Sequence, residues 1–339
     1  MKVCDKCFND IELKHYIVSN SDEKGKCDYC SEGINSPLLE VGELLDFFAE
    51  FISIFKFDDD GIPLIELIQK DWDLFSGKST GHDILLDVLA TLYSSISNPQ
   101  DNVNYIDEII ESTSYWNILK EDLKWNRRFL TDIEEIKDLG WDSLFLKKES
   151  LSLDEPFYRA RIHIIGESKP FKIDEMGNPP KNTVMSGRAN PLGIPYLYLC
   201  KKIETTFYEI RATYLDEVSI GEFHVKMDNK IDVIDFTEKG SAFLNMENLL
   251  PYTKSVFLKK EISIDLSKPI TRFDSELEYI PTQFICEFIR YITGADGILF
   301  NSSLHKGGKN IVLFDQDKVE CISVTKYRVT RVEIEAKEI

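Results

Sequence analysis

Two pairs of closely spaced cysteines near the N-terminus constrain most strongly how this chain folds. Cys4 and Cys7 form the first CxxC pair, and Cys27 and Cys30 form the second. Each CxxC turn lets two thiolates converge on one metal ion, and a short hairpin between the turns can bring the pairs together. The spacing predicts a four-thiolate zinc module over residues 1–35. Such a site leaves no open coordination position, so we expect a structural zinc rather than a catalytic one.

Composition and charge narrow the class of protein further. With 339 residues, 43% of them hydrophobic, the chain can bury more than one core. The formal net charge of −19 repels phosphate backbones and argues against bulk nucleic-acid binding. No signal peptide and no membrane-length apolar run is apparent, and the seven cysteines are an odd number. The sequence therefore predicts a cytoplasmic protein that does not bind a membrane. The three cysteines outside the CxxC pairs are expected to pack in apolar cores.

A helical pattern occupies residues 36–149. Ser36 followed by Pro37 is typical of a helix N-cap with proline at the first helical position, and apolar residues recur at helical spacing as far as Phe55. Further amphipathic runs predict helices over 63–75, 81–95, 105–112, 115–129 and 132–145. A helical bundle is the expected architecture, and no catalytic constellation is apparent in it.

Short strand-like runs mark the chain from residue 150 onward. They are FYRARIHII, YLYLC, IGEFHVKM, IDVIDF, GILFNS and NIVLF. Helices are expected at 201–211 and 282–293, and the alternating tail at 319–335 is typical of one or two antiparallel strands. This pattern predicts an α+β domain over 150–339. The chain is therefore expected to divide at residues 35 and 149 into a zinc module, a helical domain and an α+β domain.

Several polar residues of the α+β segment are candidates for a binding site. They are Arg159, Arg161, Arg188, Asn190, Tyr198, Glu209, Ser302 and Asn310. An arginine fork suits a diphosphate, and a carboxylate can stabilise positive charge on a sugar ring. Each residue also has a structural explanation, because Arg188 could cap a helix or pair with Glu204 and Tyr198 could be a core aromatic.

In combination, these motifs resemble the RES domain, a family named for its arginine, glutamate and serine. The resemblance covers residues 154–315 and rests on FYRAR, GRANPLGIPYLYL, the glutamate of TFYEIR, YIPTQFICEFIR, and DGILFNSS followed by GGKN. The preceding segment resembles the cysteine-bearing helical N-terminal domain, of HEPN/RES type, found in some members. Ala189 and Asn301 depart from the family pattern, in which tryptophan and proline are common at these positions. The pocket wall and the serine loop are therefore expected to differ in shape.

The resemblance implies an ADP-ribosyltransferase-like fold and cleavage of NAD at its nicotinamide–ribose bond, by hydrolysis or phosphorolysis. It also implies a toxin or defence effector that an antitoxin or another regulatory protein restrains. Transfer of ADP-ribose to a protein or a nucleic acid remains an alternative, because the first half of the chemistry is shared. A degenerate fold used only for binding is a third interpretation. The sequence is also compatible with a homo-oligomer.

The family pattern carries four catalytic roles onto this chain. The residues are Glu209, Arg188, Tyr198 and Ser302, with Ser303 as the alternative serine. Glu209 would stabilise an oxocarbenium-like ribosyl ring, and Tyr198 would stack on nicotinamide or bond a ribose hydroxyl. Ser302 would orient the substrate, since no histidine–aspartate pair is apparent that would make it a nucleophile. The residues expected to bind NAD are Arg159, Arg161, Arg188, Asn190, Tyr198, Ser302 and Asn310.

Overall fold

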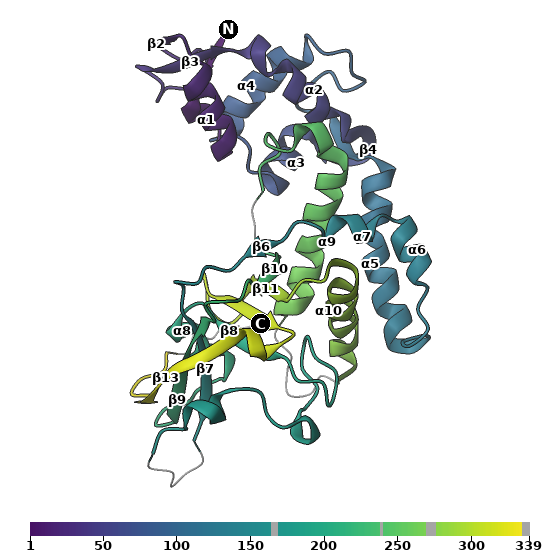
Figure 1. Cartoon of the computed structure of the whole chain (residues 1–339). Helices are drawn as coiled ribbons and strands as arrows, with labels where there is room; N and C mark the ends of the chain where they lie inside the picture. The colour runs from purple at the N-terminus through teal and green to yellow at the C-terminus, as the bar shows by residue number, and fades with distance from the viewer. Residues whose placement is uncertain (164–168, 238–239, 269–275, 334–339) are drawn as a thin grey trace. The chain divides into compact units, whose positions relative to one another are not determined.

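The computed structural model describes residues 1–163, 169–237, 240–268 and 276–333 (Figure 1). The chain forms two compact units. The first combines Met1–Ser114 with Lys239–Phe257, and the second combines Tyr115–Glu238 with Leu258–Ile339. These units are defined by contacts and each takes two separate stretches of chain, so the division into three consecutive domains remains a prediction. No helix within the described ranges is long and apolar enough to span a membrane.

A small antiparallel sheet begins the first unit. Its order is β1–β3–β2, with β1 (Lys2–Cys4), β2 (Glu23–Gly25) and β3 (Ser36–Glu40). The predicted N-cap at Ser36 and Pro37 is therefore wrong, because both residues lie in the central strand β3. Pairing on both sides of β3 buries Leu38 and Leu39 in the core. This burial outweighs the local capping signal, and the next α-helix begins only at Leu45.

Helices supply most of the remaining first unit. They are α1 (Ile11–Asn20), α2 (Leu45–Ser53), α3 (Leu64–Asp71), α4 (Lys78–Leu89) and the start of α5 (Asp107–Trp125). An antiparallel pair, β4 (Phe55–Pro63) with β5 (Asn102–Tyr105), shows that the unit is not purely helical. The break predicted between residues 112 and 115 is absent. There, the hydroxyls of Thr113 and Ser114 donate to helix carbonyls within α5 and are accommodated without ending it.

The sequence pattern does not predict the long helix α9 (Leu249–Ser267). Leu249 packs in the core of the first unit, whereas Leu258, Ile262 and Leu266 pack in a core of the second. The apolar residues therefore do not follow one stripe along the helix, and the helical period is weak. Because α9 ends beside the cavity described below, it is an element of the candidate site that the sequence does not predict.

An eight-stranded sheet forms the body of the second unit, in the order β13–β9–β7–β8–β12–β11–β10–β6. The pair β10–β11 is parallel and the other neighbours are antiparallel. The strands are β6 (Glu149–Ser150), β7 (Phe157–Ile162), β8 (Leu197–Cys200), β9 (Glu217–Val225), β10 (Asp232–Asp235), β11 (Gly297–Asn301), β12 (Lys309–Leu313) and β13 (Val319–Arg328). The predicted strands are confirmed, although residues 164–165 and 334–335 of the predicted runs lie outside the described residues.

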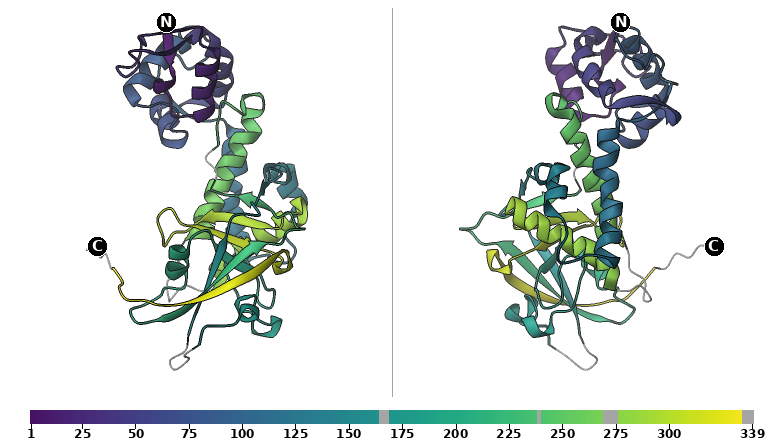
Figure 2. Two further views of the ribbon diagram at one scale, coloured as in Figure 1. Left: turned by 60° about the vertical axis from the view of Figure 1, so that its left-hand side comes forward. Right: turned by 90° about the vertical axis from the view of Figure 1, so that its right-hand side faces the viewer.

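The two faces of this sheet bury different cores, as the alternation along its strands requires. Ile298 and Phe300 pack in a core with helices α5, α7 (Trp141–Leu144), α9 and α10 (Ile280–Thr293), while Leu299 packs in the other core. That second core includes Val319 on the edge strand β13 and Val233 on β10, near the opposite edge of the sheet. Figure 2 shows the curved sheet in two views. Strands, the predicted helix α8 (Ile203–Glu209) and α10 together confirm the α+β class.

Candidate functional site

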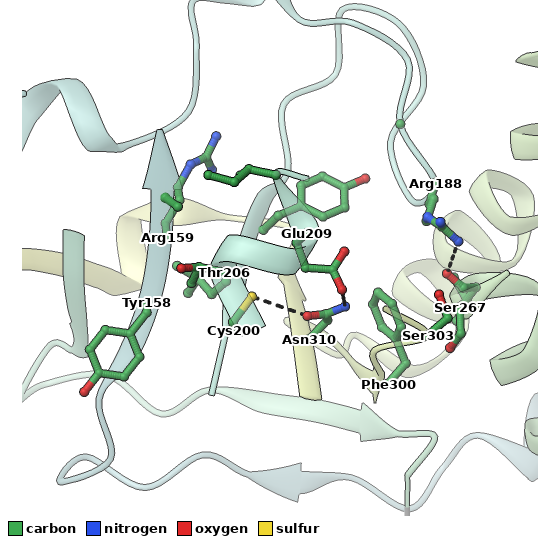
Figure 3. Close-up of a pocket in the computed structure, with 16 residues that line it drawn as sticks. Tyr158, Arg159, Arg188, Cys200, Thr206, Glu209, Ser267, Phe300, Ser303 and Asn310 are labelled. Atoms are coloured by element: carbon green, nitrogen blue, oxygen red, sulfur yellow. Dashed lines mark hydrogen bonds between the residues drawn. The ribbon is translucent and has the colours of Figure 1, made fainter. Parts of the chain in front are cut away.

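A cavity of about 320 Å³ lies in the second unit, between β7, β8, α8 and the end of α9. This volume is at the lower end of the range for small-molecule sites. The predicted residues that line the cavity are Arg159, Arg188, Tyr198, Glu209 and Asn310, together with the alternative serine Ser303 (Figure 3). The predicted residues that do not line it are Arg161, Asn190 and Ser302. Residues from distant parts of the chain thus share one cavity.

Glu209, the last residue of α8, has two hydrogen bonds on the same carboxylate oxygen. Ser302 Oγ donates to Oε1 at 2.6 Å, and Asn310 Nδ2 donates to Oε1 at 2.7 Å. No hydrogen bond from the described residues reaches Oε2. The Glu209 side chain also remains open to solvent. The arrangement therefore holds one oxygen in place and leaves the other available to a ligand.

Ser302 links its own loop to Glu209 through hydrogen bonds. Its Oγ accepts the backbone N–H groups of Leu304 at 3.3 Å and His305 at 3.1 Å while it donates to Glu209. The His305 ring bonds Thr205 through Nδ1 at 2.9 Å and stacks on Tyr208, so it does not activate Ser302. These contacts supply no base that would make Ser302 a nucleophile, and they orient Glu209 rather than a substrate, so a contact between Ser302 and NAD remains a prediction.

The two arginines at the cavity have different environments. Arg188 Nη1 donates to the carbonyl of Leu266 at 2.8 Å and to that of Lys268, so this side chain caps the C-terminal end of α9. Arg159 Nη1 is buried and has no hydrogen-bond partner among the described residues. Burial, together with the neighbouring charge of Arg161, lowers the pKa of Arg159 to about 10, which leaves it charged at neutral pH. Arg159 is therefore the better placed of the two to bind an anion.

The remaining predicted residues stabilise the walls around the cavity. Arg161 Nη2 donates to the carbonyl of Gly177 at 2.6 Å. Tyr198 Oη donates to Asn190 Oδ1 at 2.8 Å and accepts the Ala189 N–H at 3.0 Å. Asn190 is buried and its Nδ2 donates to the carbonyls of two residues in its own loop. Tyr198 thus presents its ring, rather than a free hydroxyl, to a ligand.

Gly187 is the tightest point of the loop beside Tyr198. A Cβ at this position would lie 2.4 Å from Asn190 Oδ1 and 2.8 Å from Tyr198 Oη. We expect Gly187→Ala to break the hydrogen bond between them and to lower the free energy of unfolding by about 1–3 kcal/mol. Denaturant titration measures the change. Gly42→Ala is the control, since a Cβ at residue 42 meets no atom within 4 Å. Equal stability of the two variants would contradict the packing argument.

Cys200 is a cavity residue for which the sequence predicts only core packing. Its Sγ donates to Asn310 Oδ1 at 3.3 Å, and Asn310 bonds Glu209 in turn. The relevant signal is the register of the β8–β12 pair, in which Cys200 and Asn310 are direct partners. The two residues are far apart in sequence, and neither residue type reveals this pairing. Ser267, at the end of α9, also lines the cavity. The sequence does not predict it, because the helical period of α9 is weak.

The four cysteines of the CxxC pairs lie together, as predicted. Their sulfur atoms are within 4.8 Å of one another, with Sγ–Sγ distances of 3.9 Å for Cys4–Cys7, 3.5 Å for Cys4–Cys30 and 3.4 Å for Cys7–Cys27. A tetrahedral zinc with Zn–S bonds of about 2.3 Å separates its sulfurs by about 3.8 Å. A Cβ on Gly33 would lie 2.7 Å from Cys4 Sγ, so the cluster is closely enclosed. The donors and their spacing fit a four-thiolate zinc site.

Comparison with known proteins identifies the class to which this site belongs. Residues 156–332 match the RES domain, and this match covers more than half of the chain. The chain therefore belongs to the RES domain family. None of the curated proteins matches it. Among solved structures, the crystal structure of the M. tuberculosis MbcT–MbcA toxin–antitoxin complex aligns with a TM-score of 0.32 and 12% identity, over 55% of this chain and 88% of that chain.

Proposed function

We propose that this protein binds NAD in the cavity of its second unit and cleaves the nicotinamide–ribose bond, by hydrolysis or by phosphorolysis. The observation that carries the proposal is the pairing of two unsatisfied groups in one cavity. One is Oε2 of Glu209, which suits an electron-poor sugar carbon. The other is the guanidinium of Arg159, which suits a diphosphate and whose Nη1 has no hydrogen-bond partner among the described residues. Membership in the RES domain family supports the same substrate.

Cleavage of this bond expels neutral nicotinamide and leaves positive charge on the ribosyl ring. At about 4 Å and an effective dielectric constant of about 20, a carboxylate attracts that charge by about 4 kcal/mol. An attraction realised only in the transition state corresponds to roughly a thousandfold in rate. Water then adds to the ring carbon and loses a proton to solvent, or phosphate adds and forms a phosphate ester. Glu209 needs only to remain ionised and correctly oriented.

Product analysis tests the proposal. The purified protein is incubated with NAD, with and without inorganic phosphate, and free nicotinamide and the ribosyl product are quantified. Hydrolysis gives ADP-ribose in both conditions, whereas phosphorolysis requires phosphate and gives phosphorylated ADP-ribose. ADP-ribose recovered on a macromolecule would indicate the alternative, a transferase. Absence of nicotinamide release in every condition would overturn the proposal.

We also propose a cellular role as a toxin or defence effector that a second protein restrains. Family membership and the resemblance support this role, because depletion of NAD would arrest growth. Expression of the parent chain is expected to stop growth, and Glu209→Gln is expected to relieve the arrest. A parent chain that depletes NAD without affecting growth would contradict the role while leaving the enzymatic proposal in place.

Arg159 provides a prediction in which stability and binding change in opposite directions. The lowered pKa shows that burial of the charged guanidinium opposes folding below about pH 10. Arg159→Met keeps the length and removes the charge, so we expect a rise in melting temperature of about 2–4 °C. The KM for NAD should rise about 10- to 100-fold. Calorimetry and steady-state kinetics measure the two effects.

The matched control for this substitution is Arg331→Met. Arg331 is exposed and pairs only with Glu333 among the described residues. We expect neither its melting temperature nor its KM to change. An Arg159→Met protein with the parental KM would show that Arg159 does not bind the diphosphate.

A further inference from the structure

A chain of hydrogen bonds links a buried thiol to the Glu209 carboxylate. Cys200 on β8 and Asn310 on β12 are direct partners in the antiparallel register. The Cys200 thiol donates to Asn310 Oδ1 at 3.3 Å, and Asn310 Nδ2 donates to Glu209 Oε1 at 2.7 Å. Figure 3 shows both contacts beside the cavity. The sheet register thus places Asn310 beside Cys200, and α8 supplies Glu209, the third member of the chain of bonds.

The direction of these bonds follows from the protonation of the thiol. Burial, with the nearby charge of Glu209 as a second cause, raises the pKa of Cys200 to about 12, so the thiol keeps its proton and donates it. The Asn310 amide must therefore accept from Cys200 through oxygen and donate to Glu209 through nitrogen. A reversed amide would place its oxygen against a carboxylate oxygen and its NH₂ against the thiol proton.

From these contacts we propose that Asn310 is a positioning residue for Glu209, and that Cys200 sets the orientation of the Asn310 amide. The inference rests on the proposed function, in which Glu209 stabilises the ribosyl cation. Asn310 and Ser302 donate to the same oxygen, so the carboxylate cannot rotate freely and Oε2 stays toward the cavity. This gives Asn310 a role beyond the predicted contact with NAD, because Oδ1 and one hydrogen of Nδ2 are engaged within the protein.

Asn310→Asp separates positioning from simple structural support. A protonated aspartic acid at residue 310 can still donate to Glu209, whereas an ionised one repels it. Two carboxyl groups at hydrogen-bond distance titrate as a pair that retains one proton above the usual range. We therefore expect the ratio of variant to parent kcat to fall about 10- to 100-fold from about pH 4.5 to about pH 8. Asn310→Ala should show a similar loss at every pH.

No other group at the cavity explains such a ratio. Burial lowers the pKa of Arg159 only to about 10, so its guanidinium keeps its proton near neutral pH. Burial also lowers the pKa of Arg188, which is present in the variant and the parent alike. Burial raises the pKa of Tyr158, of Tyr198 and of Cys200. His305 lies in the same loop as Ser302 and is present in both proteins, so it does not account for a change in their ratio.

Substitutions at Cys200 test the second half of the proposal. Cys200→Ser keeps a donor and should retain most of the parental kcat. Cys200→Ala removes the donor, and its kcat should fall about tenfold with little change in KM. Equal kcat in the two variants would overturn the role of Cys200.

Asn182→Asp is the control for the chemical change, since this residue is exposed and does not line the cavity. A pH-independent kcat ratio for Asn310→Asp would overturn the inference while the parent activity upholds the proposed function. A parent without NAD cleavage would overturn the proposed function instead.

Infrared difference spectra of Asn310→Asp test the pairing of the two carboxyl groups without turnover. A protonated carboxyl band that persists above about pH 5 supports the pair, and its absence refutes it.

Discussion

Glu209→Gln should lower the rate of NAD cleavage about a thousandfold and leave the fold intact. Glutamine has nearly the same volume, and its amide oxygen can still accept from Ser302 and Asn310. What is lost is the negative charge that faces the ribosyl ring, for which the Coulomb estimate is about 4 kcal/mol. Steady-state kinetics should show the loss in kcat, with a much smaller change in KM, because the interaction grows in the transition state.

Glu204→Gln is the matched control. Glu204 lies in the first turn of the same helix, is exposed and does not line the cavity. We expect its kcat and its melting temperature to equal those of the parent. Parental turnover by Glu209→Gln would refute the role that we propose for this carboxylate. A loss of thermal stability in Glu209→Gln would show instead that the substitution disturbs α8.

The second large effect is expected at the cysteine cluster. Cys7 is fully buried, and Cys7→Ser removes one thiolate from the four-sulfur set. Structural zinc contributes about 10–16 kcal/mol of apparent binding free energy in small zinc domains, which rivals the whole stability of a typical domain. We therefore expect the variant to lose its zinc and the first unit to unfold. Metal analysis by mass spectrometry and calorimetry measure the two consequences.

Cys321→Ser provides the control for this experiment. Cys321 is partly buried on β13, and its Sγ donates to a backbone carbonyl rather than to a metal cluster. The control should contain one zinc per chain, as should the parent. A parent without bound metal, or a Cys7→Ser protein that melts like the parent, would refute a structural zinc.

Local patterns predict much of this fold because they depend on neighbouring residues. The central strands of the second unit are buried on both faces, toward two cores, so short continuous apolar runs mark them. The CxxC pairs are equally local. Pro37 shows where this reasoning fails, because its helix-start signal is overridden when its strand, β3, pairs with β1 and β2. Strand pairing is a long-range contact, and a single sequence does not display it.

Family motifs identify which residues approach the candidate site but not how each is used. Arg188 and Arg159 are both plausible diphosphate ligands by residue type. Only the structure distinguishes the guanidinium that caps α9 from the one with a buried nitrogen that no described residue contacts through a hydrogen bond. Likewise, the contact of Cys200 with Asn310 depends on the register of β8 and β12. Hydrogen-bond partners across a sheet are therefore the information that sequence reasoning lacks.

The first unit is built from two separate stretches of chain, and this has a consequence for folding during protein synthesis. The first stretch of this unit ends at Ser114, but its core also contains Ala242 and Leu249. These two residues are synthesised long after Ser114. At about 5–20 residues per second, a ribosome needs roughly 7–30 seconds to translate the chain from Ser114 to Phe257. The nascent N-terminal segment must therefore wait with part of its core exposed. A chaperone that binds apolar surface would encounter it in that interval, and the rate of translation would influence the yield of folded protein.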